Sequence, residues 1–255
     1  MHLTSASQPL LCAAIFAKPV FVMFLQPFYS RQGNHVLISA EQGSRFAKSI
    51  SNDFNPIHDP DSKRFCVPGD LLFALVLERY GLSRNMSFTF AGMVARDTQL
   101  VFPSAPEDSF EIVDDRDKPY LQVSRSGEMI RNQQVIEQLI RNYVVFSGQN
   151  FPHLLVPLMA EHQVMINPQR PLVIYESMSV HFDRLDLAEP SVELADTKLE
   201  VNGKRGDAEF QFRLLDGDKA VGCGVKTLIL SGLREYQQAA IDDMVAEYSA
   251  RQNTL

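Results

Sequence analysis

The first well-patterned segment of the chain reads as a helix followed by a polar loop. Ser39 and Gln42 stand three residues apart, the spacing at which a capping box closes the start of a helix. Apolar residues then recur at helical intervals, at Phe46, Ala47 and Ile50. The next stretch, 52–64, is dense in Asp, Asn and Pro, which favour turns. We therefore predict a helix that ends near Ser51 and a tight loop after it.

A second helix is predicted directly after this loop. Pro68-Gly69-Asp70 precedes seven consecutive apolar residues, Leu71 to Leu77. A helix that is apolar nearly all round is buried rather than amphipathic. Gly81 suits the C-terminal end of such a helix, since glycine readily adopts the backbone angles found there.

Beyond Gly81 the hydrophobic period changes to one typical of strands. Strand-like runs separated by turn residues are predicted at 86–94, 98–102, 109–113, 120–124 and 135–146. In the last of these runs, Ile136, Leu139 and Ile140 also fit helical spacing.

The same order then recurs in weaker form. A short apolar helix is predicted from Leu154 to His162, and strands are predicted at 172–182, 191–201, 208–215 and 220–230. Asn202-Gly203 and Asp216-Gly217 are typical of hairpin turns. From Leu233 a final helix carries one apolar face, formed by Ile241, Met244, Val245 and Tyr248.

This order predicts one α+β architecture that is duplicated and fused, each copy an antiparallel sheet wrapped around a helix. We divide the chain into an N-terminal extension outside the fold, a first repeat, a degenerate second repeat and a C-terminal helix, at 1–22, 23–146, 147–232 and 233–255. Met23 is a plausible alternative start, because ordinary domain sequence begins at Phe24.

Composition narrows the class of protein. The chain is 45% apolar and 22% charged, as globular proteins are, with a net charge of −7 that argues against a nucleic-acid partner. Cys12, Cys66 and Cys223 are far apart, which fits reduced thiols in a cytoplasmic protein and offers no zinc motif. The apolar stretch 10–24 is too short and too interrupted for a membrane span, so we expect no membrane partner.

The segment 53–58, Asp-Phe-Asn-Pro-Ile-His, carries the candidate chemistry. Pro56 restrains its own backbone and that of Asn55, so the loop can hold Asp53 and His58 toward one point and grip a water between them. Gly69 opens the buried helix, whose free amides favour developing negative charge on a carbonyl. The alternative is a structural loop in which Asp53 caps local amides and His58 is a satisfied polar group.

At these residues the chain resembles the MaoC-like hotdog proteins, the (R)-specific enoyl-CoA hydratases. The resemblance rests on the segment 53–58 together with the segment 67–71, Val-Pro-Gly-Asp-Leu. It implies an α+β double hotdog in which Asp53 and His58 activate water and Gly69 supplies an oxyanion amide. From Phe24 onward the chain is also similar to an uncharacterised bacterial family.

The chain departs from the hydratase pattern near the second helix. Pro68 replaces the histidine that precedes the helix-start glycine in that family, Asp70 replaces an apolar residue, and the stretch between His58 and Gly69 is short. The segment 147–153 resembles a degraded copy of the motif, with Gln149 where a carboxylate would be needed. By the resemblance, the N-terminal half would carry the chemistry.

Hydration of an enoyl thioester is therefore the leading expectation. Acyl-thioester hydrolysis and non-catalytic acyl binding stay open as alternatives. We expect an acyl group carried by coenzyme A or an acyl carrier protein, no further cofactor or metal, and a monomer or homodimer. Asn55, Phe73, Phe88 and Phe90 are the candidate substrate-binding residues.

Overall fold

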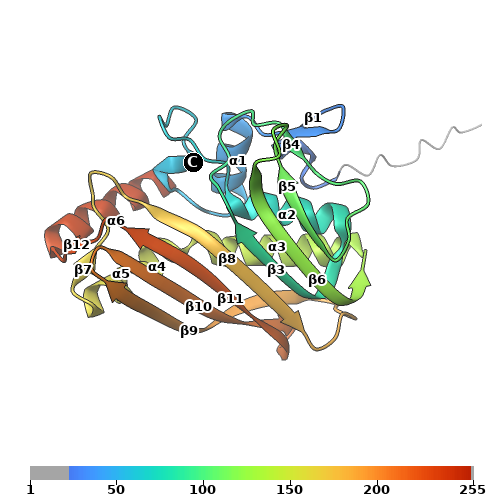
Figure 1. Ribbon diagram of the computed structural model, residues 1–255. Helices are drawn as coiled ribbons and strands as arrows, with labels where there is room; N and C mark the ends of the chain where they lie inside the picture. The colour runs from blue at the N-terminus through green and yellow to red at the C-terminus, as the bar shows by residue number, and fades with distance from the viewer. Residues whose placement is uncertain (1–22, 254–255) are drawn as a thin grey trace, which may run out of the picture.

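A computed structural model describes residues 23–253 as an α+β protein built on one large sheet (Figure 1). The helices are α1 (Ala40–Ser49), α2 (Gly69–Tyr80), α3 (Gln133–Gly148), α4 (Asn150–His153), α5 (Leu155–Glu161) and α6 (Gln238–Gln252), with the short 3₁₀ helices η1 (Gln26–Phe28) and η2 (Pro56–His58). The strands of the large sheet are β1 (Ser30–Gln32), β2 (His35–Leu37), β3 (Leu82–Phe90), β4 (Leu100–Val101), β5 (Ser109–Val113), β6 (Pro119–Ile130), β8 (Val173–Phe182), β9 (Pro190–Asn202), β10 (Arg205–Asp216) and β11 (Lys219–Ser231). A separate small sheet pairs β7 (Val164–Met165) with β12 (Arg234–Glu235).

The large sheet is antiparallel throughout and has an internal correspondence. Its order is β1-β2-β4-β5-β6-β3-β8-β11-β10-β9. In each half, the first long strand after a helix pairs with the last strand of that half, so β4-β5-β6-β3 mirrors β9-β10-β11-β8. The halves join where β3 pairs with β8, from Asn85 opposite His181 to Thr89 opposite Ser177. One continuous sheet therefore spans both halves.

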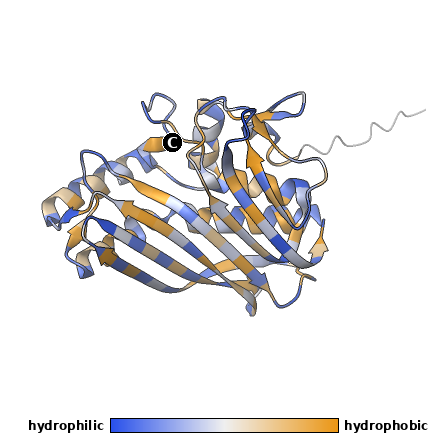
Figure 2. Cartoon of the chain, viewed as in Figure 1, coloured by the Kyte–Doolittle hydropathy of each residue, from blue (hydrophilic) through white to orange (hydrophobic). Residues whose placement is uncertain are grey.

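The helices α2 and α3 lie together on one face of the sheet (Figure 1). Every residue from Leu71 to Leu77 is buried, because the sheet covers one side of α2 and α3 covers another. The ring of Phe73 packs against Phe88 of β3 at 5.1 Å and against Tyr143 of α3 at 4.8 Å. Along the strands, hydrophobic and hydrophilic residues alternate, as expected for a sheet with one covered face (Figure 2).

The predicted strand at 135–146 is wrong, because this segment belongs to α3. Val135, Ile136, Leu139 and Ile140 are all buried, and helical spacing brings them to one face toward the core. The predicted boundary between residues 146 and 147 falls inside α3. The short helix predicted at 154–162 is present as α5, but α3 is the long helix that covers the second half of the sheet.

Other predicted elements are confirmed with shifted ends. The strand β3 ends at Phe90, four residues early, and β6 continues to Ile130. The last helix begins at Gln238 rather than Leu233, because Arg234 and Glu235 pair with β7. Both predicted hairpin turns are present: Gly203 and Gly217 have φ values of 59° and 58°, which favour glycine.

The proposed extension, residues 1–22, lies outside the described part of the chain. Within residues 23–253, no helix combines the length and apolar character needed to cross a membrane. The same residues contain no cluster of three or more His, Cys, Asp and Glu side chains that could hold a metal ion. Cys66 and Cys223 are free thiols.

Candidate active site

The loop between α1 and α2 is held rigid by its own polar groups. The Asp53 carboxylate accepts a hydrogen bond from the Asn55 amide at 2.9 Å, and the Asn55 side-chain oxygen accepts from the Ile57 amide at 3.1 Å. This second bond caps η2, in which Pro56 occupies the first turn. The capping box predicted at Ser39 is also present and starts α1, which leads into the loop. Local sequence therefore determines the shape of the loop.

Charged residues from two helices anchor the far end of the same loop. The carboxylate of Asp59 lies 2.7 Å from Lys48 of α1 and 2.5 Å from Arg251 of α6. On the near side, the Tyr248 hydroxyl accepts a hydrogen bond from the Phe54 amide at 3.3 Å. The C-terminal helix thus returns to the loop and holds it at two points (Figure 1).

His58 and Asp53 face one another, as the sequence predicted. His58 Nε2 lies 3.4 Å from Asp53 Oδ2, and His58 Nδ1 lies 2.7 Å from the Cys66 carbonyl oxygen. A carbonyl can only accept, so Nδ1 carries a proton and donates it. In neutral His58, Nε2 is therefore an acceptor, facing a second acceptor on Asp53. A water that lies beside both atoms could give one O–H to each and keep its lone pairs free.

The environment of His58 acts on its protonation in two directions. Burial, the largest influence, lowers the pKa of His58, but the hydrogen bond and charge of Asp53 and the Cys66 carbonyl outweigh it, so the net pKa is raised. The side chain of Asp53 keeps 22% of its surface exposed, against 11% for His58. The pair is thus open on the carboxylate side.

Gly69 begins α2, and aromatic rings occupy the space that a side chain at this position would need. A Cβ placed there would come within 3.0 Å of both Phe90 and Tyr175. Those two rings are in contact, with centroids 4.2 Å apart and planes tilted by 32°. The first amides of a helix have no partner inside it, so the amides at Gly69 and Asp70 can receive a carbonyl oxygen.

A second polar cluster, formed by Asp70, Ser147 and Lys226, is buried at the junction of the halves. The Ser147 hydroxyl donates to Asp70 Oδ2 at 2.7 Å and accepts from Lys226 Nζ at 2.5 Å. The Lys226 ammonium also lies 4.3 Å from the centre of the Tyr175 ring. Burial raises the pKa of Asp70 and lowers that of Lys226, while the charge of each partly opposes the shift of the other. We call these three residues the junction cluster.

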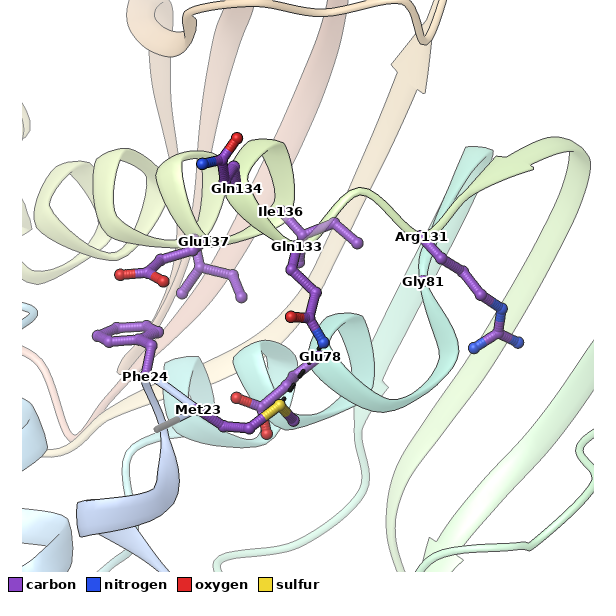
Figure 3. Close-up of a pocket in the computed structure, with 10 residues that line it drawn as sticks. Met23, Phe24, Glu78, Gly81, Arg131, Gln133, Gln134, Ile136 and Glu137 are labelled. Carbon is purple, nitrogen blue, oxygen red and sulfur yellow. Dashed lines mark hydrogen bonds between the residues drawn. The ribbon is translucent and has the colours of Figure 1, made fainter. Parts of the chain in front are cut away.

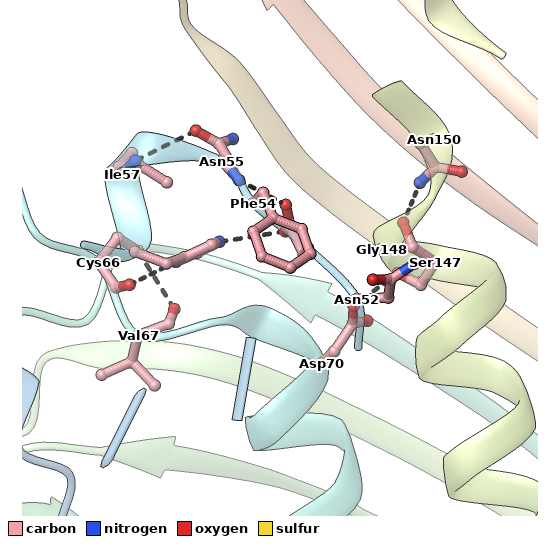
Figure 4. A network of polar contacts seen from close by, with 12 residues as sticks. Asn52, Phe54, Asn55, Ile57, Cys66, Val67, Asp70, Ser147, Gly148 and Asn150 are labelled. Carbon is pink, nitrogen blue, oxygen red and sulfur yellow. Dashed lines mark hydrogen bonds and ion pairs between the residues drawn. The ribbon is translucent and has the colours of Figure 1, made fainter. Parts of the chain in front are cut away.

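One cavity of about 620 Å³ connects the loop pair to the junction cluster. Its volume is in the range of small-molecule sites. It is lined by Asp53, His58 and Asp70 from the first half, and by Ser147, Tyr175 and Lys226 from the second. Figure 4 shows the loop on one side and Asp70, Ser147 and Asn150 on the other. The two halves therefore build one composite site.

A second cavity, of about 350 Å³, lies where the described chain begins (Figure 3). It is lined by Phe24, Glu78, Arg131, Glu137 and neighbouring side chains. None of the predicted site residues reaches it, so the larger cavity is the candidate active site.

The structure separates the predicted substrate-binding residues. Asn55 and Phe90 line the cavity beside Asp53, His58 and Gly69. Phe73 and Phe88 do not belong to its lining: they are 2% and 0% exposed and pack in the core instead. The two rings instead form a contact between α2 and β3.

Sequence reasoning missed the partners of Asp70. Ser147 lies in the segment 147–153, and Lys226 lies in the predicted strand 220–230. One signal was available: Lys226 is two residues before Leu228 and four before Leu230, so alternation places it on their inward face. Gln149, where a carboxylate was judged to be missing, follows the end of α3.

The site is thus a cavity with the Asp53 and His58 pair at one side and the buried junction cluster at the other. The chain belongs to the family described as "Protein of unknown function (DUF3581)", whose model matches residues 23–239. No match was found among curated proteins.

Solved structures include loose likenesses to this chain. An acyl-CoA thioesterase II, TesB2, from Mycobacterium marinum is 9% identical, with 84% of this chain and 99% of that chain covered at a TM-score of 0.41. A conserved protein of unknown function with a hot dog fold from Alicyclobacillus acidocaldarius is 9% identical, with 80% of this chain and 95% of that chain covered at a TM-score of 0.40. A putative thioesterase II from Thermobifida fusca is 10% identical, with 80% of this chain and 95% of that chain covered at a TM-score of 0.37.

Proposed function

We propose that this chain is a double-hotdog enzyme that hydrolyses an acyl thioester carried by coenzyme A or an acyl carrier protein. The observation that carries the proposal is the Asp53 and His58 pair, in which Asp53 Oδ2 and His58 Nε2, an acceptor when His58 is neutral, face one another at 3.4 Å in the larger cavity. Two facing acceptors suit a water molecule that attacks an electrophilic carbon.

The double-hotdog part rests on the matching topology of the two halves. Each half has one long helix covering the sheet and four strands in the corresponding order. The two four-stranded units join through β3 and β8 into one sheet. A duplicated and fused unit accounts for this correspondence.

The proposed reaction uses the start of α2 and the loop pair together. The thioester oxygen lies against the free amides at Gly69 and Asp70, which favour its negative charge as water adds. Asp53 takes one proton from the water, and the oxygen of that water bonds to the carbonyl carbon. The tetrahedral centre then collapses and the carbon–sulfur bond breaks. The proton held by Asp53 goes to the departing thiolate. The products are a carboxylic acid and a free thiol.

Hydration of an enoyl thioester is the second candidate, favoured by the hexapeptide at 53–58. Sequence alone put it first. We place hydrolysis first because it has fewer geometric requirements: a water must only reach the carbonyl carbon. Hydration also requires the C2–C3 bond to align with the pair and a proton to reach C2. Position 68, a histidine in the resembling hydratases, is a proline that lines this cavity.

One assay separates the two reactions. Purified chain is given octanoyl-CoA and, in parallel, crotonyl-CoA, and free thiol and enoyl absorbance are both recorded. We expect thiol release from octanoyl-CoA, and a fall in kcat by a factor of roughly 10²–10⁴ in Asp53→Asn and in His58→Gln. Loss of enoyl absorbance without thiol release would instead establish hydration.

The matched control is Asp114→Asn. Asp114 is also a carboxylate that accepts local backbone amides, but it lies in the turn after β5 and does not line this cavity. It should keep wild-type turnover. Octanoyl-CoA and crotonyl-CoA that bind tightly but undergo neither reaction would contradict the enzymatic proposal and support a binding module.

A further inference from the structure

Two buried oxygen atoms, one in the junction cluster and one next to it, have no hydrogen-bond partner within residues 23–253. They are Asp70 Oδ1 and Asn150 Oδ1. Their residues are 7% and 6% exposed, and both line the larger cavity. Figure 4 shows them on either side of Ser147. Both atoms accept hydrogen bonds and neither, as an ionised carboxylate or amide oxygen, can donate one.

The donors that Ser147, Asn150 and Lys226 offer are already engaged. The Ser147 hydroxyl donates to the other oxygen of Asp70, and the Asn150 amide donates to the Ser147 carbonyl. The Lys226 ammonium donates to the carbonyl and hydroxyl of Ser147 and faces the Tyr175 ring. Satisfying either orphan acceptor from within this cluster would break one of these contacts.

A plain hydrocarbon chain would therefore be a poor ligand for this side of the cavity. When an apolar group covers a buried acceptor, the acceptor loses its hydration and gains no hydrogen bond, which costs free energy. A group that brings its own O–H would satisfy one or both oxygens and keep the junction cluster intact. Another part of the wall, which includes Phe90, Leu155 and Leu228, is apolar and suits the rest of an acyl chain.

We propose that Asp70 and Asn150 form a subsite for a hydroxyl group on the acyl chain, so that the preferred substrates are hydroxyacyl thioesters. This inference rests on the proposed function, since it assumes that an acyl thioester fills the cavity. It adds what the loop pair cannot determine, namely the chemical class of the acyl group. The rival explanation is a purely structural cluster that never meets a ligand.

The test is a binding comparison that needs no turnover. Coenzyme A analogues in which a methylene replaces the thioester sulfur carry an octanoyl chain that is unsubstituted, hydroxylated near the carbonyl or hydroxylated at its end. Calorimetry with the wild-type chain should show one hydroxylated analogue binding roughly 10- to 100-fold more tightly than the unsubstituted one. Equal affinity for all three would overturn the subsite but leave the proposed function standing. No binding of any analogue would count against the proposed function itself.

The variant Asn150→Leu adds a test that a structural role would not pass. Leucine is close to asparagine in size but offers no acceptor. We expect the variant to bind the hydroxylated analogue more weakly and the unsubstituted analogue more tightly than wild type does, because an apolar surface has replaced an unpaired acceptor. A uniform loss of affinity for all analogues would indicate a structural cluster and contradict the subsite.

Discussion

The two polar regions of the cavity are built in opposite ways. The loop pair, Asp53 and His58, comes from six consecutive residues whose own amides hold the carboxylate and cap the turn. The junction cluster comes from α2, α3 and β11, and its members lie up to 156 positions apart in the sequence, from 70 to 226. The first is partly open to solvent, and the second is almost fully buried.

The difference concerns what each region depends on. The loop pair is positioned largely by hydrogen bonds within the loop, with α1 and α6 anchoring its two ends. A buried charge depends on its partners, because leaving one of them alone inside the protein is costly. We therefore expect changes in the loop pair to act mainly on turnover, and changes in the junction cluster to act on stability as well.

The largest stability effect should come from Lys226→Met. It removes the cation that faces Asp70 through Ser147 and leaves a carboxylate buried without it. We expect a loss of about 3–5 kcal/mol in the free energy of unfolding, measured by urea denaturation. The double variant Asp70→Asn/Lys226→Met should recover part of this loss, since no charge is then left alone. Additive losses would mean that the two groups are not coupled.

Gly148→Ala tests the point where the two regions touch. A Cβ on Gly148 would lie 1.9 Å from the Ser51 carbonyl oxygen and 3.2 Å from the Asp53 Cβ. The loop must move away from α3, and we expect a cost of about 1–3 kcal/mol in stability together with reduced turnover. Gly33→Ala is a control for adding a methyl group where nothing lies within 4 Å, although its φ of 59° adds backbone strain. Wild-type turnover in Gly148→Ala would show that the loop pair tolerates displacement.

Tyr248→Phe should have a smaller effect on stability. It removes the hydroxyl that accepts from the Phe54 amide and lies 3.4 Å from the Asn52 and Gly148 carbonyls. The ring contact with Phe54 remains. We expect a loss of about 1 kcal/mol, measured by thermal or urea unfolding. A loss as large as that of Lys226→Met would contradict the view that the loop holds its own shape.

The gentlest test follows the protonation of His58. Its pKa is raised above the ordinary 6.5 by Asp53, so the pair's contribution to stability is present at low pH and is lost as pH rises through the folded-state pKa. Turnover, which needs neutral His58, should rise over the same range. In Asp53→Asn, burial dominates and the pKa should fall, as an NMR titration of the His58 ring would show. An unchanged titration would mean that Asp53 does not set the protonation of His58.

Sequence by itself determined the loop pair and the two helices around it. The capping box at Ser39, the turn residues at 53–58 and the apolar run after Gly69 act over short distances, and the structure places each as predicted. Sequence also indicated a duplicated order of helix and strands. It did not resolve 135–146, where helical and strand spacing both fit and burial against the sheet decides for a helix.

Only the tertiary structure decided what faces the loop pair. Phe73 and Phe88 belong to the core, and Ser147 and Lys226 complete the cavity. Local propensity cannot bring residues 70, 147 and 226 together, because their proximity depends on the pairing of β3 with β8 and on α3 packing beside α2. A short polar motif is specified by bonds within it, whereas a buried charged cluster exists only once the core around it has formed.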